Sequence, residues 1–155
     1  MPSSGSEFLP YVALGLVVLG WFVANLQANA RGDRKEARSL VDSAKALSVR
    51  IVDDSLKYLC EGQVGLATKI KSSLDELEVE LSRLPNFSSK ASPLLHALVA
   101  FQDAVTGGDF ETANPVKRGR DSDEVATVLR TRVALQAELE RQFRVYYLGG
   151  GSTLQ

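Results

Sequence analysis

Few residues of this chain have the types and spacing that catalysis or metal binding requires. His96 is the only histidine and Cys60 the only cysteine, so neither a disulfide framework nor a multi-cysteine zinc site can form. His96 points away from the apolar face of its predicted helix, and Cys60 precedes the acidic Glu61, which does not activate a thiol. Asp53 and Asp54 are adjacent, and neighbouring helix positions diverge by about 100°. The sequence therefore predicts a protein that is not an enzyme and needs no metal or cofactor.

A short basic cluster is the strongest local candidate for binding chemistry. Lys117, Arg118 and Arg120 lie in a predicted loop, where they could contact anionic head groups at about 1 kcal/mol each. They could instead bind an acidic partner or nucleic acid. Acidic residues follow the cluster at once and partly neutralise it: Asp121, Asp123 and Glu124. An ordinary solvated loop is the alternative interpretation.

The overall charge is nearly balanced. The chain has 18 basic and 19 acidic side chains in 155 residues, whereas a general nucleic-acid binder needs a strong basic excess. We expect no nucleic-acid partner, and no small-molecule substrate is evident from the sequence.

An uncharged stretch over residues 8–30 is the longest apolar segment. A membrane-crossing helix needs about 20 mainly apolar residues, so the stretch predicts a single-pass membrane anchor after a short tail, residues 1–7. Basic residues follow it without any before it, which predicts an outside N-terminus and a domain on the cytoplasmic side of the inner (plasma) membrane. The anchor residues expected to contact membrane lipid are Leu9, Tyr11, Leu14, Leu16, Val18, Leu19, Trp21 and Phe22.

Two alternatives to a retained anchor stay open. Ala28-Asn29-Ala30 resembles a signal-peptide cleavage site, although no basic region precedes the apolar run. A buried helix of a soluble domain is the other, although it would usually have a polar face. If the anchor is retained, the four-residue spacing of Gly20, Ala24 and Ala28 could bring two membrane helices together, but small residues are also common in membrane helices.

The remainder predicts an all-α domain over residues 31–148, with a flexible tail over 149–155. Apolar positions recur at helical spacing over 33–84, and further helices are expected over 93–106 and 122–148, packed antiparallel to the first as a helical hairpin or bundle. Gly62 and Gly65 interrupt the first segment. We favour one long kinked helix, because the apolar stripe stays in register across the glycines; a hairpin is the alternative.

The anchor and the amphipathic helices predict a scaffold or protein-interaction module that binds another protein or itself. Its expected partner surface is the stripe Leu66, Ile70, Leu74, Leu77 and Leu81. A helical sensor is a second hypothesis, with a ligand cavity among Phe101, Phe143 and Tyr146. A third is an envelope-spanning or lysis role with the helices outside the cytoplasm, which the basic flank disfavours.

Overall fold

The computed structural model describes the backbone of residues 9–84, 87, 92–112 and 115–148, and within them the side chains of Trp21 and of residues 31–147. The chain divides into two compact units, Met1–Glu36 and Ala37–Gln155. Helix α1, Leu9–Leu56, begins in the first unit and continues into the second. The fold below is that of the second unit.

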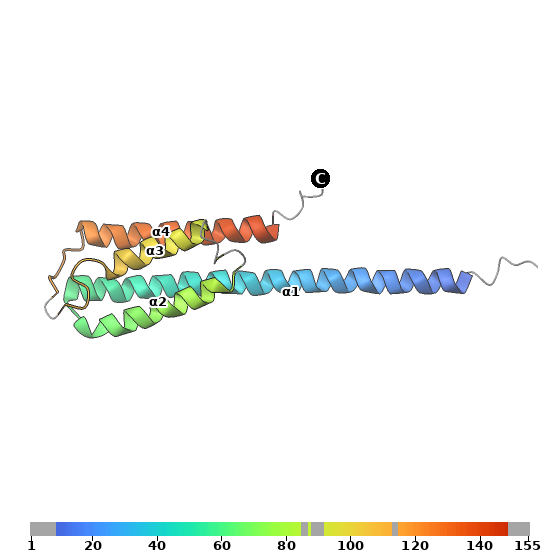
Figure 1. The fold of residues 1–155 in the computed structure, drawn as a ribbon, viewed down its shortest axis with the longest axis horizontal. Helices are drawn as coiled ribbons and strands as arrows, with labels where there is room; N and C mark the ends of the chain where they lie inside the picture. Colours follow the sequence, from blue (N-terminus) through green and yellow to red (C-terminus); the bar gives the residue numbers. More distant parts are fainter. Residues whose placement is uncertain (1–8, 85–86, 88–91, 113–114, 149–155) are drawn as a thin grey trace, which may run out of the picture. The chain divides into compact units, whose positions relative to one another are not determined.

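Four α-helices pack together in the described part of the second unit. They are residues 37–56 of α1, α2 (Ala67–Ser82), α3 (Pro93–Thr106) and α4 (Asp123–Phe143), which a π-helical turn, Arg144–Leu148, extends. Successive helices alternate in direction, so the unit is an up-and-down bundle (Figure 1). The all-α prediction is confirmed, as is the bundle of packed helices.

The prediction of one long helix over 33–84 is wrong, and the hairpin alternative is correct. The α-helix ends at Leu56, and a π-helical turn, Lys57–Glu61, leads to Gly62, whose φ of 72° is left-handed. The Gly62 amide closes the turn by donating to the Tyr58 carbonyl at 3.1 Å. α2 then returns along α1, as shown by the bond from the Ser43 hydroxyl to Glu80 (2.9 Å). The stripe stays in register because both arms face one core.

The two later helices form where their caps predict. Ser92 precedes Pro93, and its hydroxyl accepts a hydrogen bond from the Leu95 amide at 3.4 Å. Ser122 caps α4 through the Val125 amide at the same distance. Both serines satisfy an amide that the first helical turn leaves unpaired, and α3 and α4 begin at the residues that follow them, Pro93 and Asp123.

All four helices contribute to a single hydrophobic core. Each presents residues at three- and four-residue steps, which places them on one face. The deeply buried members of this core include Val41, Ala44, Leu47 and Ile51 of α1, Ile70, Leu77 and Leu81 of α2, Leu94, Leu98 and Phe101 of α3, and Val128, Leu135 and Leu139 of α4.

The predicted anchor falls almost wholly outside the described side chains. Among the residues that the structure describes, no helix is long and apolar enough to cross a membrane. The side chain of Trp21 is described and is 67% exposed. The other anchor residues, and Gly20, Ala24 and Ala28, lie outside the described side chains.

Candidate interaction surface

A hollow between α1 and α4 exposes apolar side chains inside a charged rim. Its volume is about 410 Å³. Leu56, Val125 and Leu129 supply its apolar lining. The charged residues that line it are Asp53, Lys57, Glu61 and Arg120.

Further exposed apolar residues lie on the same flanks of the two helices as the residues that line the hollow. Val49 lies two helical turns before Leu56 on α1, and Val133 lies one turn after Leu129 on α4, so each shares a helix flank with a lining residue. The exposed fractions are 38% for Val49, 37% for Leu129 and 56% for Val133. We call these three residues together with Leu56 the α1/α4 groove.

Polar contacts between α1 and α4 hold the two sides of the groove in register. The Gln136 amide nitrogen Nε2 donates to the Ser48 hydroxyl at 3.0 Å. Val49 follows Ser48 in the chain, and Val133 lies one turn before Gln136. The two valines therefore flank the same contact.

Glu140 forms a charged link between the same helices. Lys45 and Arg38 both donate to its carboxylate, Arg38 from Nη1 at 3.0 Å. These hydrogen bonds, that of Lys45 first, lower the pKa of Glu140, and the bond to Glu140 is the main reason that the pKa of Arg38 is raised. The Arg38 guanidinium also lies 5.4 Å from the centre of the Phe143 ring, a cation–π distance.

The basic loop cluster separates into one structural residue and two exposed ones. Arg118 is half-buried and pairs with Asp109 (3.2 Å) and Glu124 (3.4 Å), and its backbone amide donates to the Leu59 carbonyl at 2.8 Å. The hydrogen bond from the Val116 amide is the main reason that the pKa of Asp109 is lowered, and Arg118 contributes further to the lowering. Arg118 therefore fastens the α3–α4 loop to the α1–α2 turn.

The other two members of the cluster remain accessible. Arg120 lines the α1/α4 hollow, and neither Lys117 nor Arg120 forms an ion pair with any residue that the structure describes. The Lys117 side chain covers Gly62, because a methyl group there would lie 2.7 Å from its Cε atom. Only Arg120 therefore joins the candidate surface.

A second hollow of about 410 Å³ is acidic. Its ionisable lining residues are Asp103, Asp109, Arg118, Asp123 and Glu124. Arg118 pairs with two of these carboxylates, those of Asp109 and Glu124. No group of three or more His, Cys, Asp or Glu residues suited to a metal occurs within the part of the chain that the structure describes. His96 is exposed on α3, and Cys60 is half-buried.

The stripe expected to bind a partner lies instead inside the bundle. The exposed fraction is 4% for Leu74 and 0% for Ile70, Leu77 and Leu81, while Leu66 packs partly buried against them. The hairpin explains the difference, because folding α2 back on α1 uses the stripe for the protein's own core. These residues therefore do not form an exposed surface.

The cavity expected for a ligand is also largely filled. Phe101 is wholly buried in the core, whereas Tyr146 is 43% exposed. A hollow of only about 10 Å³ lies beside Phe143 and Tyr146, against the 300–1,000 Å³ typical of ligand pockets. Tyr147 stacks on Phe143, with ring centres 5.5 Å apart.

The α1/α4 groove was not predicted from the sequence. Leu129 lies at the edge of the buried face of α4 and is partly exposed. Val133, four residues later, lies still further from that face. The signal available in the sequence was this pair of apolar residues, which lies beside the buried apolar stripe of α4.

Comparison of the chain with protein-family models, curated proteins and solved structures finds no match.

Proposed function

We propose that the chain is a non-enzymatic, single-pass protein of the inner membrane, whose helical bundle binds another protein on the cytoplasmic side through the α1/α4 groove. The exposed apolar groove with its charged rim is the observation that carries the binding part of the proposal. Protein interfaces commonly have this composition, an apolar centre surrounded by polar residues that stay in contact with water.

The groove is favoured over other apolar positions because its members share the flanks of two helices. Leu56 and Leu129 line one hollow, and Val49 and Val133 lie on the same helix flanks as these two residues. Val79 on α2 is as exposed as Val133, 56% in each case, but its neighbours one turn away include Asp75, Glu76 and Arg83. A single exposed valine among charges is ordinary protein surface.

The membrane part of the proposal rests on the uncharged stretch over residues 8–30 and its basic C-terminal flank. A reporter fused after Gln155, active only in the cytoplasm, tests the orientation. An active reporter, together with an uncleaved chain that is found in the membrane fraction, supports the proposal. A translocated reporter contradicts the orientation, and a soluble product lacking the stretch contradicts the anchor.

Photo-crosslinking in cells tests the groove. A benzoyl-phenylalanine residue replaces Val133 in one variant and Val79 in the other. The two replaced residues are matched controls, because both are valines and both are equally exposed. We expect a discrete adduct from position 133 that Val49→Glu abolishes, with none from position 79. Equal adducts from both positions, or no adduct from position 133, would contradict the assignment.

A further inference from the structure

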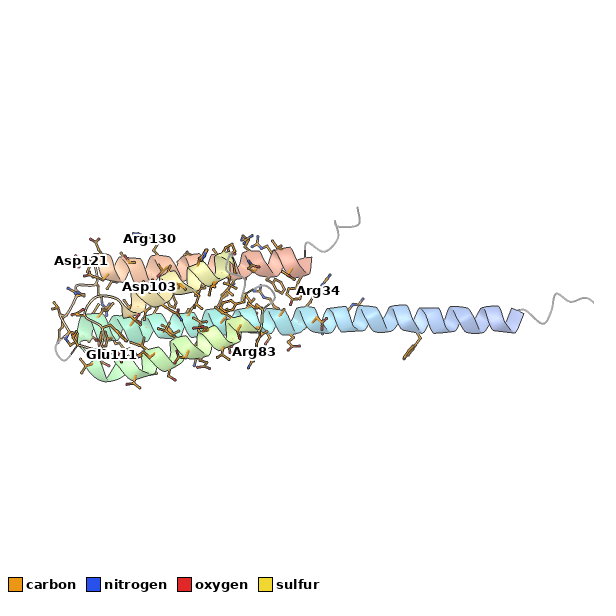
Figure 2. The ribbon with its side chains drawn as sticks, in the orientation of Figure 1. Arg34, Arg83, Asp103, Glu111, Asp121 and Arg130 are labelled. Carbon is orange, nitrogen blue, oxygen red and sulfur yellow. The ribbon has the colours of Figure 1, made fainter. Side chains whose placement is uncertain are left out.

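The first turns of the bundle and the last turns of α4 lie at the same end of the second unit. Arg38, one residue after the unit begins, pairs with Glu140 and lies over the Phe143 ring. The C-terminal part of α2 lies at this end as well, because Glu80 accepts a hydrogen bond from Ser43. Figure 2 shows Arg83 at the α2 end that meets this part of α1.

Arginine, tyrosine and valine side chains are exposed at this end. Arg83 and Arg144 are both exposed and form no ion pair with any described residue. Val145 is 58% exposed and Tyr146 43%. We call these four residues the arginine–tyrosine end.

This combination matches the chemistry of a membrane surface. Tyrosine is enriched at the level of the lipid head groups, where one part of its ring is apolar and its hydroxyl stays hydrated. Arginine donates charge-assisted hydrogen bonds to phosphate, and an exposed valine can enter the boundary between head groups and acyl chains.

The covalent chain ties this end to the proposed anchor, so the inference rests on the proposed function. Ala37, the first residue of the bundle unit, lies seven positions after Ala30, the last residue of the uncharged stretch. Even fully extended, seven residues span at most about 25 Å. We propose that the arginine–tyrosine end lies against the anionic head groups of the membrane that holds the anchor.

A lipid surface is favoured over a second protein because of this tether. Any surface so close to an anchored segment meets the bilayer at a very high effective concentration. The α1/α4 groove, whose hollow lies near the opposite end of the bundle at Glu61 and Arg120, then remains available to a soluble partner.

Depth-dependent quenching in vesicles tests the inference with the full chain. A Cys60→Ser background removes the native thiol, and a bimane label is placed at Val145→Cys or at Val116→Cys. Val116 is a matched control because it is 59% exposed and lies in the α3–α4 loop at the other end. The chain is reconstituted in vesicles of phosphatidylcholine and phosphatidylglycerol that contain a lipid with a nitroxide on its head group.

We expect strong quenching at position 145 and little at 116. Quenching at 145 should fall to the level at 116 in vesicles of phosphatidylcholine alone, or when Arg83→Glu and Arg144→Glu are combined. Equal quenching at the two positions in the anionic vesicles overturns the inference. So does quenching at position 145 that is unchanged by removing the anionic lipid and by replacing both arginines. Vesicle flotation separates the two proposals: a chain that does not float refutes the anchor as well.

Discussion

Replacing Gly62 by alanine distinguishes a hairpin from a continuous helix by the sign of the stability change. In the structure Gly62 has φ 72° and ψ 32°, where an L-residue with a Cβ atom is less stable by about 1–2 kcal/mol. The free energy of unfolding should fall by that amount, which lowers the melting temperature by about 4–8 °C. In a continuous helix the same change would raise stability by about 1 kcal/mol, because alanine is the better helix former.

Two further variants separate backbone strain from crowding. A Cβ atom at position 62 would also lie 2.7 Å from the Lys117 Cε atom, but that flexible side chain can move aside. Gly62→Ala should therefore cost about the same when combined with Lys117→Ala. Gly62→Asn should restore part of the loss, because asparagine tolerates left-handed backbone better than alanine does.

Gly65 provides the matched control. It has no positive φ, and a Cβ atom there would meet nothing within 4 Å, so Gly65→Ala should leave stability unchanged or raise it by up to about 1 kcal/mol. Urea unfolding of the full chain, followed by circular dichroism, measures all four variants. A Gly62→Ala protein as stable as the parent, or more stable, would refute the left-handed turn and with it the hairpin.

Three other perturbations test the packing, the charge pair and a cap. Leu98→Ala, at a core position that is 1% exposed, should lower the unfolding free energy by about 2–5 kcal/mol; a smaller loss in urea titration would contradict its place in the core. Because Lys45 and Arg38 lower the folded-state pKa of Glu140, their stabilisation is present above the unfolded pKa of about 4.3 and is lost as pH falls through the folded pKa. Glu140→Gln should flatten stability against pH in that acid range, and an unchanged profile would refute the pairing. Ser122→Ala removes the α4 cap and should cost about 1 kcal/mol in thermal unfolding, whereas no change would show that the cap is unimportant.

The helices and the core could be predicted from the sequence because they depend on local patterns. Ser92-Pro93 and Ser122 mark helix starts by capping chemistry alone. Leu94, Leu98 and Phe101 recur at helical spacing, and the structure buries all three.

The hairpin could not be decided from that pattern. A stripe that stays in register across Gly62 is compatible with one helix, and equally with two helices whose stripes meet the same core. The choice depends on the φ of Gly62 and on contacts such as Ser43 with Glu80, which are 37 residues apart. Helical periodicity carries no information on contacts at that distance.

The candidate surface was mispredicted for the same reason. An apolar stripe shows that a helix face is buried, but not whether the protein's own chain or another chain covers it. Once α2 folds back, Ile70 and Leu77 belong to the core, and the exposed residues are the flanking ones, Leu129 and Val133. The role of Arg118 depends on the same tertiary arrangement, since its partners Asp109 and Glu124 come from both sides of the loop.

The even number of helices also determines how the bundle responds to mechanical force. The chain enters at Ala37 and leaves α4 at the end marked by the contact of Arg38 with Glu140 and Phe143. A force applied between these two points peels α1 from α4 one turn at a time. It does not load the two helices in shear. The Arg38–Glu140 pair carries the load first, followed by Lys45 and then Ser48 with Gln136. Because each step breaks few contacts, the bundle should unfold at low force even though its core is well buried.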